Sequence, residues 1–531
     1  MVEPVEFTWL VILAVPALVV SGAFAAAVLP RIAGLDAPLR RAVLLIYGVR
    51  LTAALGLFGL TILVGSSPGS PVAGPGFWRG ISDAAAYHNG AVEQLAARSH
   101  GINLREPDFF GELVAFLYAY VGPNPLPLIV LNAIFDVVTL TLLLLLSTQV
   151  LGRGPPAWLA WGLGLWPSWL GWSVQLLKDA LLLCLSTTAL VLAVVAISKA
   201  VHAREWAPSG RLWLGLLLVL ASVGLIRTGV ADVLSAAMGI AVMWGWALTL
   251  RGRTPWSAAV VLTALTALLP TQVFVRQLLY RSASTAERVE AWSALGVAYE
   301  RDHVAAKALR AYSVALSIDP DSTFARNRLA ILSSEIPPVL VGTDRGSSAA
   351  SVAASPALAV PLFATRSDVP SDASWVQRFR RYFDRFSLQG VARLRQSVGR
   401  LQVAPDADLS TIGGLTRFLP IGLAHALFGP FPWAMFSGDG ATDVLGFASL
   451  IELVWLIFVV PLGCVGLVVA CRKANPVHFL TATYVALGIL GLGIGVANDG
   501  LLFRYRLPFV VPLAVFVPLA LRTLTRSQQH D

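Results

Sequence analysis

Apolar runs of about 20 residues recur along this chain, and each is long enough to cross a hydrocarbon core of about 30 Å as an α-helix. Segments of about ten residues that alternate in polarity, which would indicate a transmembrane barrel, do not occur in the sequence. We therefore predict an all-α fold, a polytopic transmembrane helical bundle of about 11 spans. The predicted spans lie near residues 8–30, 43–65, 125–150, 157–175, 180–198, 212–226, 229–249, 256–275, 446–471, 478–497 and 508–522.

The composition agrees with a membrane protein. Of the 531 residues, 56% are hydrophobic and 13% are charged, whereas soluble domains carry about 25% charged residues. A net charge of +9 would suggest nucleic acid in a soluble protein, but here the basic cytoplasmic loops account for most of it, so no nucleic-acid partner is expected. The cysteines Cys184, Cys464 and Cys471 lie within apolar runs and lack the spacing of metal ligands.

Basic residues in the short connections predict the orientation of the chain, because cytoplasmic loops are rich in Lys and Arg. Every second connection is basic, which puts the N-terminus outside and the C-terminus in the cytoplasm of a membrane taken to be the bacterial inner membrane. The acidic start of the chain, without a basic residue before the first span, argues against a cleaved signal peptide. The basic residues of these connections are Arg31, Arg40, Arg41, Arg153, Lys199, Arg204, Arg211, Arg251, Arg253, Arg472, Lys473, Arg522 and Arg526.

This topology predicts three parts. Residues 1–275 form an N-terminal membrane domain whose first outer loop is 66–124. Residues 276–415 form a large, mainly helical extracytoplasmic loop, and residues 416–531 form a C-terminal membrane domain. A Ser-, Ala- and Pro-rich stretch at 343–375 is typical of a flexible linker.

The segment 415–433 is apolar but interrupted by Pro420, Pro430 and Pro432. A crossing there would place Arg472 and Lys473 outside, so we expect an interfacial or re-entrant piece.

One motif in the large loop is specific. The stretch 289–320 resembles a tetratricopeptide repeat, which is a hairpin of two antiparallel helices. Such repeats usually stack in about three copies, and this one is single, so it packs on the rest of its own chain or docks a protein partner. The matching residues are Trp292, Leu295, Gly296, Tyr299, Ala308, Tyr312, Ala315 and Pro320.

Several cations fall on the predicted outer face, against the orientation bias. They are either snorkelling side chains at the lipid interface or ligands for an anion. Arginine suits phosphate because its planar fork donates two parallel hydrogen bonds. "FRYRLP" places two arginines before a proline, where non-helical backbone would let both point the same way. The cations are Lys178, Arg227, Arg276, Arg281, Arg504 and Arg506.

Acidic residues gather on the same face. Asp83 opens the stretch "SDAAAYHNGAVEQLA", with Tyr87 one turn later, and Asp179 follows Lys178 at the start of a predicted span. A carboxylate at a helix start is also a common cap or dipole contact. His88 projects from another side of its helix and is expected to be a surface or packing residue.

Two further charges lie inside the predicted bilayer, where each needs a partner or water. Counting the rise per residue places Arg50 and Asp136 about 10 Å apart in depth, so we expect each to find its own partner elsewhere in the bundle.

Taken together, the acid in the first outer loop, the helix beginning "EPDFFGELVAFLYAYVG", the "KD" at 178–179 and the late "RYRLP" resemble GT-C membrane glycosyltransferases, in particular bacterial family-39-like or dolichyl-phosphate-mannose-type members. The resemblance covers residues 43–250 and, more loosely, 410–520. One extra span precedes Asp83, and no second acid stands beside it, which departs from the family pattern.

The resemblance implies an enzyme that moves a sugar from a polyprenyl-phosphate carrier to a glycan, lipid or protein acceptor of the cell envelope. Asp83 would be the general base and Asp179 the second acidic residue. Tyr87, Lys178, Arg227, Arg504 and Arg506 would bind substrate. The resemblance implies no certain cofactor and leaves open a divalent metal ion, which prefers several oxygen ligands.

Two other functions fit the sequence. A polymerase or O-antigen-ligase-like enzyme would use loop residues such as Arg301, His303 and Arg310. A transporter or scaffold without catalysis would use the repeat to recruit a partner, although transporters commonly show repeated sets of spans, which we do not find here.

Overall fold

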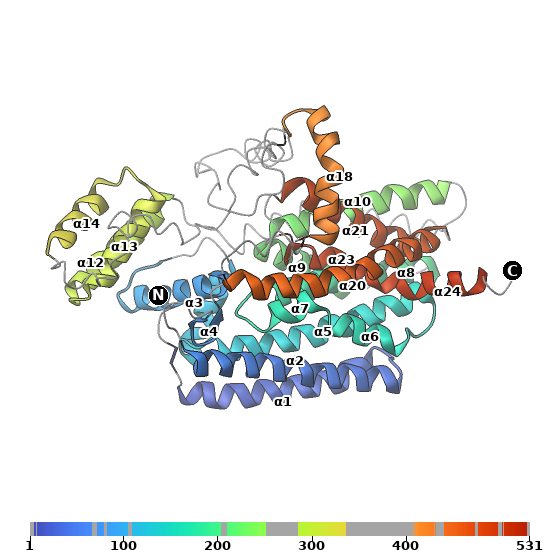
Figure 1. The fold of residues 1–531 in the computed structure, drawn as a ribbon, viewed down its shortest axis with the longest axis horizontal. Helices are drawn as coiled ribbons and strands as arrows, with labels where there is room; N and C mark the ends of the chain where they lie inside the picture. The colour runs from blue at the N-terminus through green and yellow to red at the C-terminus, as the bar shows by residue number, and fades with distance from the viewer. Residues whose placement is uncertain are drawn as a thin grey trace. The chain divides into compact units, whose positions relative to one another are not determined.

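The computed structural model separates the chain into two compact units (Figure 1). Unit 1 contains residues 1–85, 124–280 and 387–531, and unit 2 contains residues 86–123 and 281–386. Within these units the structure describes residues 5–6, 8–65, 72–78, 82–104, 109–202, 210–250, 285–335, 407, 409–429, 431, 440–472, 476–496, 502 and 504–527.

Unit 1 is built from long apolar helices, and α1, α2, α5 and α20 run roughly alongside one another in Figure 1. Helix α1 (Trp9–Ile32) begins at Thr8, whose hydroxyl accepts from Val11 N. Asp36 caps α2 (Ala37–Val64) in the same way, accepting from Leu39 N, as short polar side chains at N-caps do. The other helices of unit 1 are α5 (Leu126–Leu151), α6 (Ala157–Gly164), α7 (Pro167–Ser173), α8 (Asp179–His202), α9 (Gly210–Ile226), α10 (Thr228–Leu250), α18 (Ile412–Phe428), α20 (Gly440–Cys471), α21 (Pro476–Gly495), α23 (Leu507–Leu513) and α24 (Val517–Ser527), with the 3₁₀ turn Ala514–Phe516 between the last two.

Seven of the described helical segments are long and apolar enough to cross a membrane, so the prediction of an integral membrane protein of helical type is supported. Helices α9 and α10 were also predicted as spans, but their apolar described parts are shorter. The span predicted at 256–275 lies outside the described residues, as do the linker at 343–375, Arg276 and Arg281. The seven segments are Trp9–Ile32, Ala37–Val64, Leu126–Leu151, Asp179–Ala196, Ser449–Cys471, Val477–Gly495 and Leu507–Thr525.

The span predicted at 157–175 is not one continuous helix. The chain forms two short helices, α6 and α7, separated at Leu165 and Trp166. Pro167 at the start of α7 cannot donate a backbone hydrogen bond, so it ends the preceding helix. Gly164 is the last residue of α6, and Arg50 Nε donates to its carbonyl oxygen at 2.9 Å.

Arg50 and Asp136 form a direct ion pair, contrary to the expectation from their depth. Arg50 Nη1 lies 2.6 Å from Asp136 Oδ2, and neither side chain is more than 2% exposed. The guanidinium also lies over the ring of Trp169, whose Nε1 donates to Asp136 Oδ1 at 2.6 Å. The long arginine stem covers the difference in depth, and two buried charges are far less costly paired than apart.

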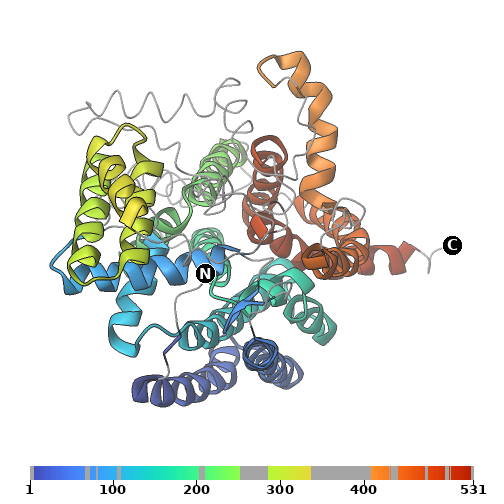
Figure 2. The same cartoon turned by 60° about the vertical axis from the view of Figure 1, so that its left-hand side comes forward.

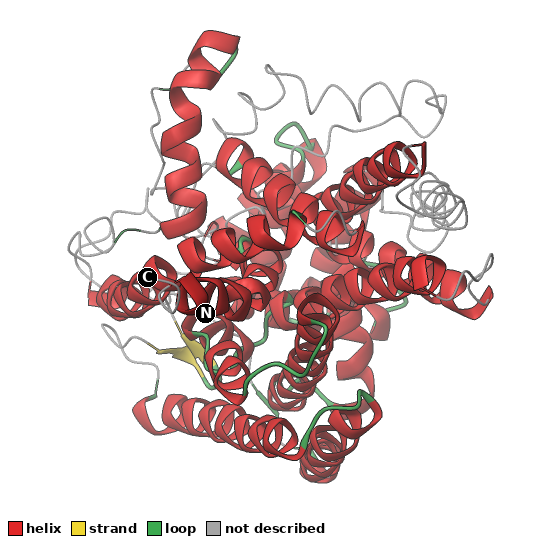
Figure 3. Ribbon diagram, turned by 90° about the vertical axis from the view of Figure 1, so that its right-hand side faces the viewer, coloured by secondary structure: helices red, strands yellow, loops and turns green. Residues whose placement is uncertain are grey.

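The first outer loop begins with a short β-hairpin that packs on the end of α2. Strands β1 (Val72–Gly74) and β2 (Phe77–Trp78) are antiparallel and form the small sheet in Figure 3. Gly76 in their turn has a positive φ of 83°, and its N–H donates to Thr61 Oγ1 at 2.5 Å. A Cβ at Gly76 would lie 2.7 Å from the ring of Phe58, so a glycine is needed at this close approach.

One end of unit 1 gathers several element termini. Asn124, just before α5, donates to Glu6 O near the start of α1 at 2.9 Å, and the β-hairpin closes on the last turn of α2 through Thr61. Helix α8 begins at this same end, because the loop before it is bonded to α5 within two turns of the start of α5. We call this end the site face.

Helix α18 contains residues 415–428 of the segment 415–433, for which an interfacial or re-entrant piece was predicted. It has 17 residues and crosses the direction of α20 in Figure 1. It packs on α21 with backbone in contact, since a Cβ at Gly422 would lie 2.3 Å from Gly493 O. Whether α18 crosses the bilayer stays a prediction.

Unit 2 contains α3 (Ser82–Ser99) from Ala86 onward, together with α4 (Phe109–Val121), α12 (Thr285–Arg301), α13 (Ala305–Ile318) and α14 (Thr323–Glu335). Helices α12, α13 and α14 lie side by side (Figure 2). The hairpin predicted over 289–320 is present as α12 and α13, and Gly296 admits the ring of Tyr312, which a Cβ would meet at 2.6 Å. Burial raises the pKa of the Tyr312 hydroxyl to about 12.

We predict that Arg50→Met destabilises the protein by about 3–5 kcal/mol, because it leaves Asp136 as an unpaired buried carboxylate. The measurement is thermal unfolding in detergent. Adding Asp136→Leu to this variant should recover most of the lost stability, since the pair is then replaced by apolar side chains.

Arg41→Met is the matched control, because Arg41 is exposed on the same helix. If Arg50→Met unfolds at the same temperature as Arg41→Met, the ion pair does not stabilise the bundle.

Candidate functional site

Asp179 is the first residue of α8, and the loop before it is held by α5. Asn132 Nδ2 donates to Gln175 O at 2.8 Å and to Leu177 O at 3.4 Å. Lys178 O in turn accepts from Leu182 N in the first turn of α8, at 2.8 Å. Lys178 and Asp179 are both buried, so two charged residues are fixed in place beneath the site face.

Arg504 joins the two acids that the sequence singled out. Its Nε and Nη2 donate to Asp179 Oδ2 at 3.0 and 2.7 Å, and its Nη1 donates to Asp83 Oδ2. The three residues come from positions 83, 179 and 504, and all belong to unit 1. The structure therefore brings these three residues into direct contact, while their roles stay a prediction.

The two carboxylates differ in their access to solvent. The Asp179 side chain is 4% exposed and the Asp83 side chain is 43% exposed. Within the described part of the chain, Asp179 Oδ1 is buried without a hydrogen-bond partner. Trp172 lies beneath the guanidinium, with Arg504 Cζ 5.4 Å from the ring centre. Asp83 therefore lies on the solvent-accessible side of this cluster, which we call the open side, and Asp179 lies on its buried side, the closed side.

Arg506 does not join Arg504, contrary to the prediction that both point the same way. Residues 504–505 are helical, and Arg506 N donates to Leu502 O at 3.1 Å. On a helix, side chains two positions apart point to nearly opposite sides, about 200° apart. Arg506 Nη2 instead donates to Glu452 Oε1 at 2.6 Å, and its Nη1 donates to Gly429 O.

Glu452 collects several donors in a fully buried position. Besides Arg506, its Oε1 accepts from Ser168 Oγ at 2.7 Å and from Trp166 Nε1 at 3.3 Å. This cluster connects α20, α7 and the end of α18. Its arrangement fits a structural ion pair, so Arg506 is better explained by the packing of the bundle than by substrate binding.

Arg227 is the single non-helical residue between α9 and α10. Its guanidinium lies 3.4 Å above the ring of Tyr505, the residue after Arg504. Nε and Nη1 of Arg227 are without a hydrogen-bond partner among the described residues. Arg227 therefore stacks on the residue that directly follows Arg504 in the sequence.

Tyr87 and His88 are packed in unit 2. The ring of Tyr87 meets that of Phe110 edge-on, at 4.9 Å between centroids. His88 is buried, with Nδ1 2.9 Å from Tyr118 Oη, which agrees with the packing role expected for it. Burial raises the pKa of Tyr118 well above its usual value, so this hydroxyl stays protonated at neutral pH.

A divalent metal ion does not fit this cluster. In the part of the chain that the structure describes, no three His, Cys, Asp or Glu residues gather to bind a metal. Asp83 and Asp179 are only two ligands, and Arg504 lies between them as a positive charge. A second cation there would meet electrostatic repulsion, whereas hard cations need several oxygen ligands.

The loop residues of the alternative enzyme do not form a comparable cluster within the described segments. Arg301 and His303 lie exposed at the turn between α12 and α13, with His303 at a positive φ of 58°. Arg310 on α13 pairs instead with Glu93 on α3, at 3.0 Å.

The helical hairpin packs on its own chain, as one of the two sequence interpretations expected. Its core contains Ala97 and Leu104 together with Trp292, Leu295 and Tyr299. His100 Nε2 also lies 3.2 Å from Asp302 Oδ2.

Sequence reasoning missed two residues that shape the site, Asn132 and Trp172, and also Glu452, the buried partner of Arg506. Asn132 and Trp172 both lie within apolar runs of the sequence. Only the folded chain shows that Asn132 holds the loop before α8 and that Trp172 lies against the Arg504 guanidinium. Glu452 could have been found, because it is an acid within a predicted span and such acids are rare there.

No model of a known protein family matches this chain, and no curated protein matches it either.

We predict that Arg504 is coupled more strongly to Asp179 than to Asp83. Double-mutant cycles with Arg504→Gln, Asp179→Asn and Asp83→Asn should give about 2–5 kcal/mol for the buried pair and less than about 1 kcal/mol for the half-exposed pair. The measurement is unfolding in detergent. Equal couplings, or a larger one for Asp83, would contradict the assignment of open and closed sides.

Proposed function

We propose that this protein is an integral membrane glycosyltransferase of the GT-C type, which moves a sugar from a polyprenyl-phosphate-linked donor to an envelope acceptor at the extracytoplasmic face. The observation that carries the proposal is the shared contact of Arg504 with Asp83 and Asp179. Two acids and an arginine that lie far apart in sequence meet in one cluster, next to a second buried cation, Lys178.

The position of the cluster supports the extracytoplasmic side. It lies at the site face, where α1 and α5 begin and α2 ends. The basic residues between α1 and α2, namely Arg31, Arg40 and Arg41, belong to the opposite end of these helices. Because basic loops stay in the cytoplasm, the site face would lie outside.

The chemistry follows from the difference between the two acids. Asp83, the more exposed one, accepts the proton of an acceptor hydroxyl, and the acceptor oxygen attacks the anomeric carbon of the donor sugar. The bond between that carbon and the phosphate oxygen breaks, and the lipid phosphate leaves with the bonding electrons. The product is the glycosylated acceptor.

The cations have a distinct role in this reaction. Arg504, Lys178 and Arg227 stabilise the negative charge that develops on the departing phosphate, as preorganised donors do in many enzymes. Asp179 holds Arg504 in place through two hydrogen bonds. An anionic donor competes with Asp83 for Arg504 Nη1, so donor binding itself frees Asp83 to act as a base.

Neither alternative has an observation of comparable strength. The O-antigen-ligase-like enzyme would need Arg310, which is already paired with Glu93. The scaffold would need a hairpin with a free docking surface, but the α12–α13 hairpin shares its core with α3. A protein partner on the outer side of residues 289–320 stays an untested prediction.

We predict that Asp83→Asn lowers the rate of sugar transfer by about 10²–10⁴-fold, because the amide cannot accept the proton. The assay uses purified protein in vesicles, a polyprenyl-phosphate sugar and extracted envelope acceptors. Stability should change little, since Asp83 is the half-exposed partner of Arg504.

Glu112→Gln is the matched control, because Glu112 is also a partly exposed carboxylate paired with an arginine, Arg98, at 3.4 Å. It should transfer sugar at the normal rate. Full activity of Asp83→Asn in the same assay would remove Asp83 as the base and, with it, the proposed mechanism.

A further inference from the structure

Helix α4 is a helix of 13 residues with a single charged residue, Glu112. At 1.5 Å per residue it extends about 20 Å, too short to cross a bilayer. Apart from Glu112 and the hydroxyls of two tyrosines its side chains are apolar, and a helix of this kind belongs in a protein core or in contact with lipid, not in water. Both of its faces therefore need an apolar environment.

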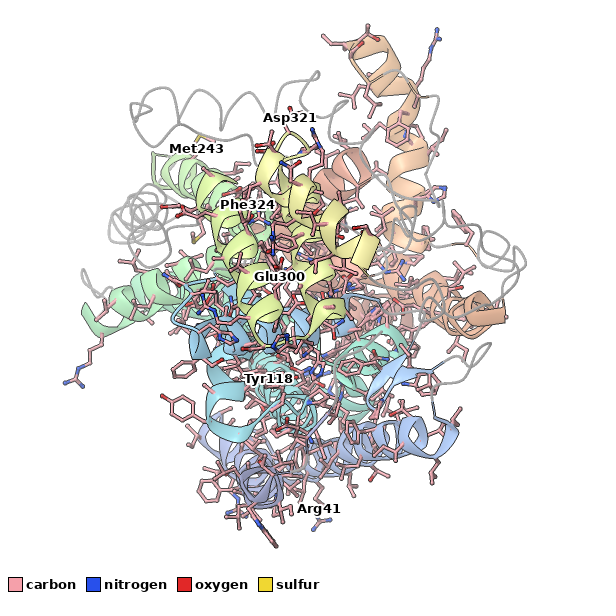
Figure 4. The ribbon with its side chains drawn as sticks, turned by 90° about the vertical axis from the view of Figure 1, so that its left-hand side faces the viewer. Arg41, Tyr118, Met243, Glu300, Asp321 and Phe324 are labelled. Atoms are coloured by element: carbon pink, nitrogen blue, oxygen red, sulfur yellow. The ribbon has the colours of Figure 1, made fainter. Side chains whose placement is uncertain are left out.

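The inner face of α4 is accounted for by contacts within unit 2. Phe110 packs on Tyr87, and Tyr118, labelled in Figure 4, contacts His88. Glu112 pairs with Arg98 at the end of α3. These contacts fix which side of α4 faces the protein.

The outer face of α4 is open. Phe116 is 51% exposed and Tyr120 is 62% exposed, and their rings meet edge-on at 5.1 Å. Leu113 is half-buried and Ala119 is exposed on the same side, and neither carries a charge. An apolar patch with aromatic side chains and without charges marks an interaction surface.

The chain itself limits what this surface can reach. Helix α4 ends at Val121, and α5, a membrane-spanning candidate, begins at Leu126. Five residues span at most about 18 Å, so the end of α4 stays close to the level at which α5 enters the membrane.

We propose that the outer face of α4 is a lipid-contact surface, with Phe116 and Tyr120 inserted among the headgroups and the first carbons of the acyl chains. Aromatic side chains with one polar tip are enriched at this depth. Interfacial helices bury their apolar side by about 5–10 Å. We identify the bilayer as the occupant of this surface, because α4 is joined by a few residues to α5, which is a candidate membrane span. A second copy of the protein would not be held near α4 in this way.

The contact has a consequence for unit 2. Helix α4 is bound to α3, and α3 is bound to the α12–α13 hairpin through Ala97 and the Glu93–Arg310 pair. A lipid anchor on α4 therefore restrains the whole of unit 2 at the membrane surface. This inference does not depend on the proposed enzymatic activity.

The test uses a nitroxide spin label on the full-length protein in vesicles of phosphatidylcholine and phosphatidylglycerol. The label is attached at Phe116→Cys or Tyr120→Cys, in a background where Cys184, Cys464 and Cys471 are replaced by alanine. The measurement is the accessibility of the label to oxygen, which partitions into lipid, and to a nickel chelate, which stays in water.

Phe324→Cys on α14 is the matched control, because Phe324, labelled in Figure 4, is also 51% exposed. We expect labels at positions 116 and 120 to favour oxygen and the label at 324 to favour the nickel chelate. Since the Phe116 and Tyr120 side chains are more than half exposed, these variants should fold normally, which their unfolding temperatures verify.

Two results would overturn the proposal. Nickel accessibility at position 116 equal to that at 324 would show that α4 faces water. A label shielded from both reagents would show that protein covers the surface, and dipolar coupling between labels on two molecules would then identify a second copy as the occupant.

Discussion

The structure depends most on the requirement that every charge buried in its apolar bundle has a partner. In the described residues, Arg504 meets this requirement by binding two carboxylates at once. An arginine can do so because its guanidinium has five N–H donors in a planar fork. Since the carboxylates come from the starts of α3 and α8, one guanidinium fixes where the first outer loop meets the membrane helices, and the candidate site is a product of this constraint.

The same requirement explains two irregular places in the bundle. Arg50 and Asp136 lie beside the break between α6 and α7, where Arg50 also binds the buried carbonyl of Gly164 at the end of α6. Arg506 and Glu452 lie where α18 ends, and Arg506 binds the carbonyl of Gly429 there. In both cases an ion pair supplies the donors that an interrupted helix lacks. The charges therefore stabilise departures from regular helices, which a purely apolar sequence could not tolerate in a membrane.

Much of the fold could be predicted from apolar length, because crossing a bilayer requires a fixed number of residues. The interruption at Pro167 was missed, since the apolar run continues through it. The hairpin at 289–320 was predictable, as small Gly296 faces Tyr312. At the site, Asp83, Asp179 and Arg504 were found because charges are rare in this chain. Their mutual contact, the separate direction of Arg506 and the Arg50–Asp136 pair depend on side-chain reach and backbone conformation, which local sequence does not determine.

Sugar transfer from an outer-leaflet lipid donor requires that Asp83 and its partners face the extracytoplasmic side. The most direct measurement is labelling of a single cysteine at the exposed position Ala86, one turn after Asp83 on α3, with a membrane-impermeant maleimide in intact cells. A cysteine at Arg41, between α1 and α2, reports the opposite side. We expect position 86 to be labelled in intact cells and position 41 only after permeabilisation, and the reverse pattern would contradict the proposed function.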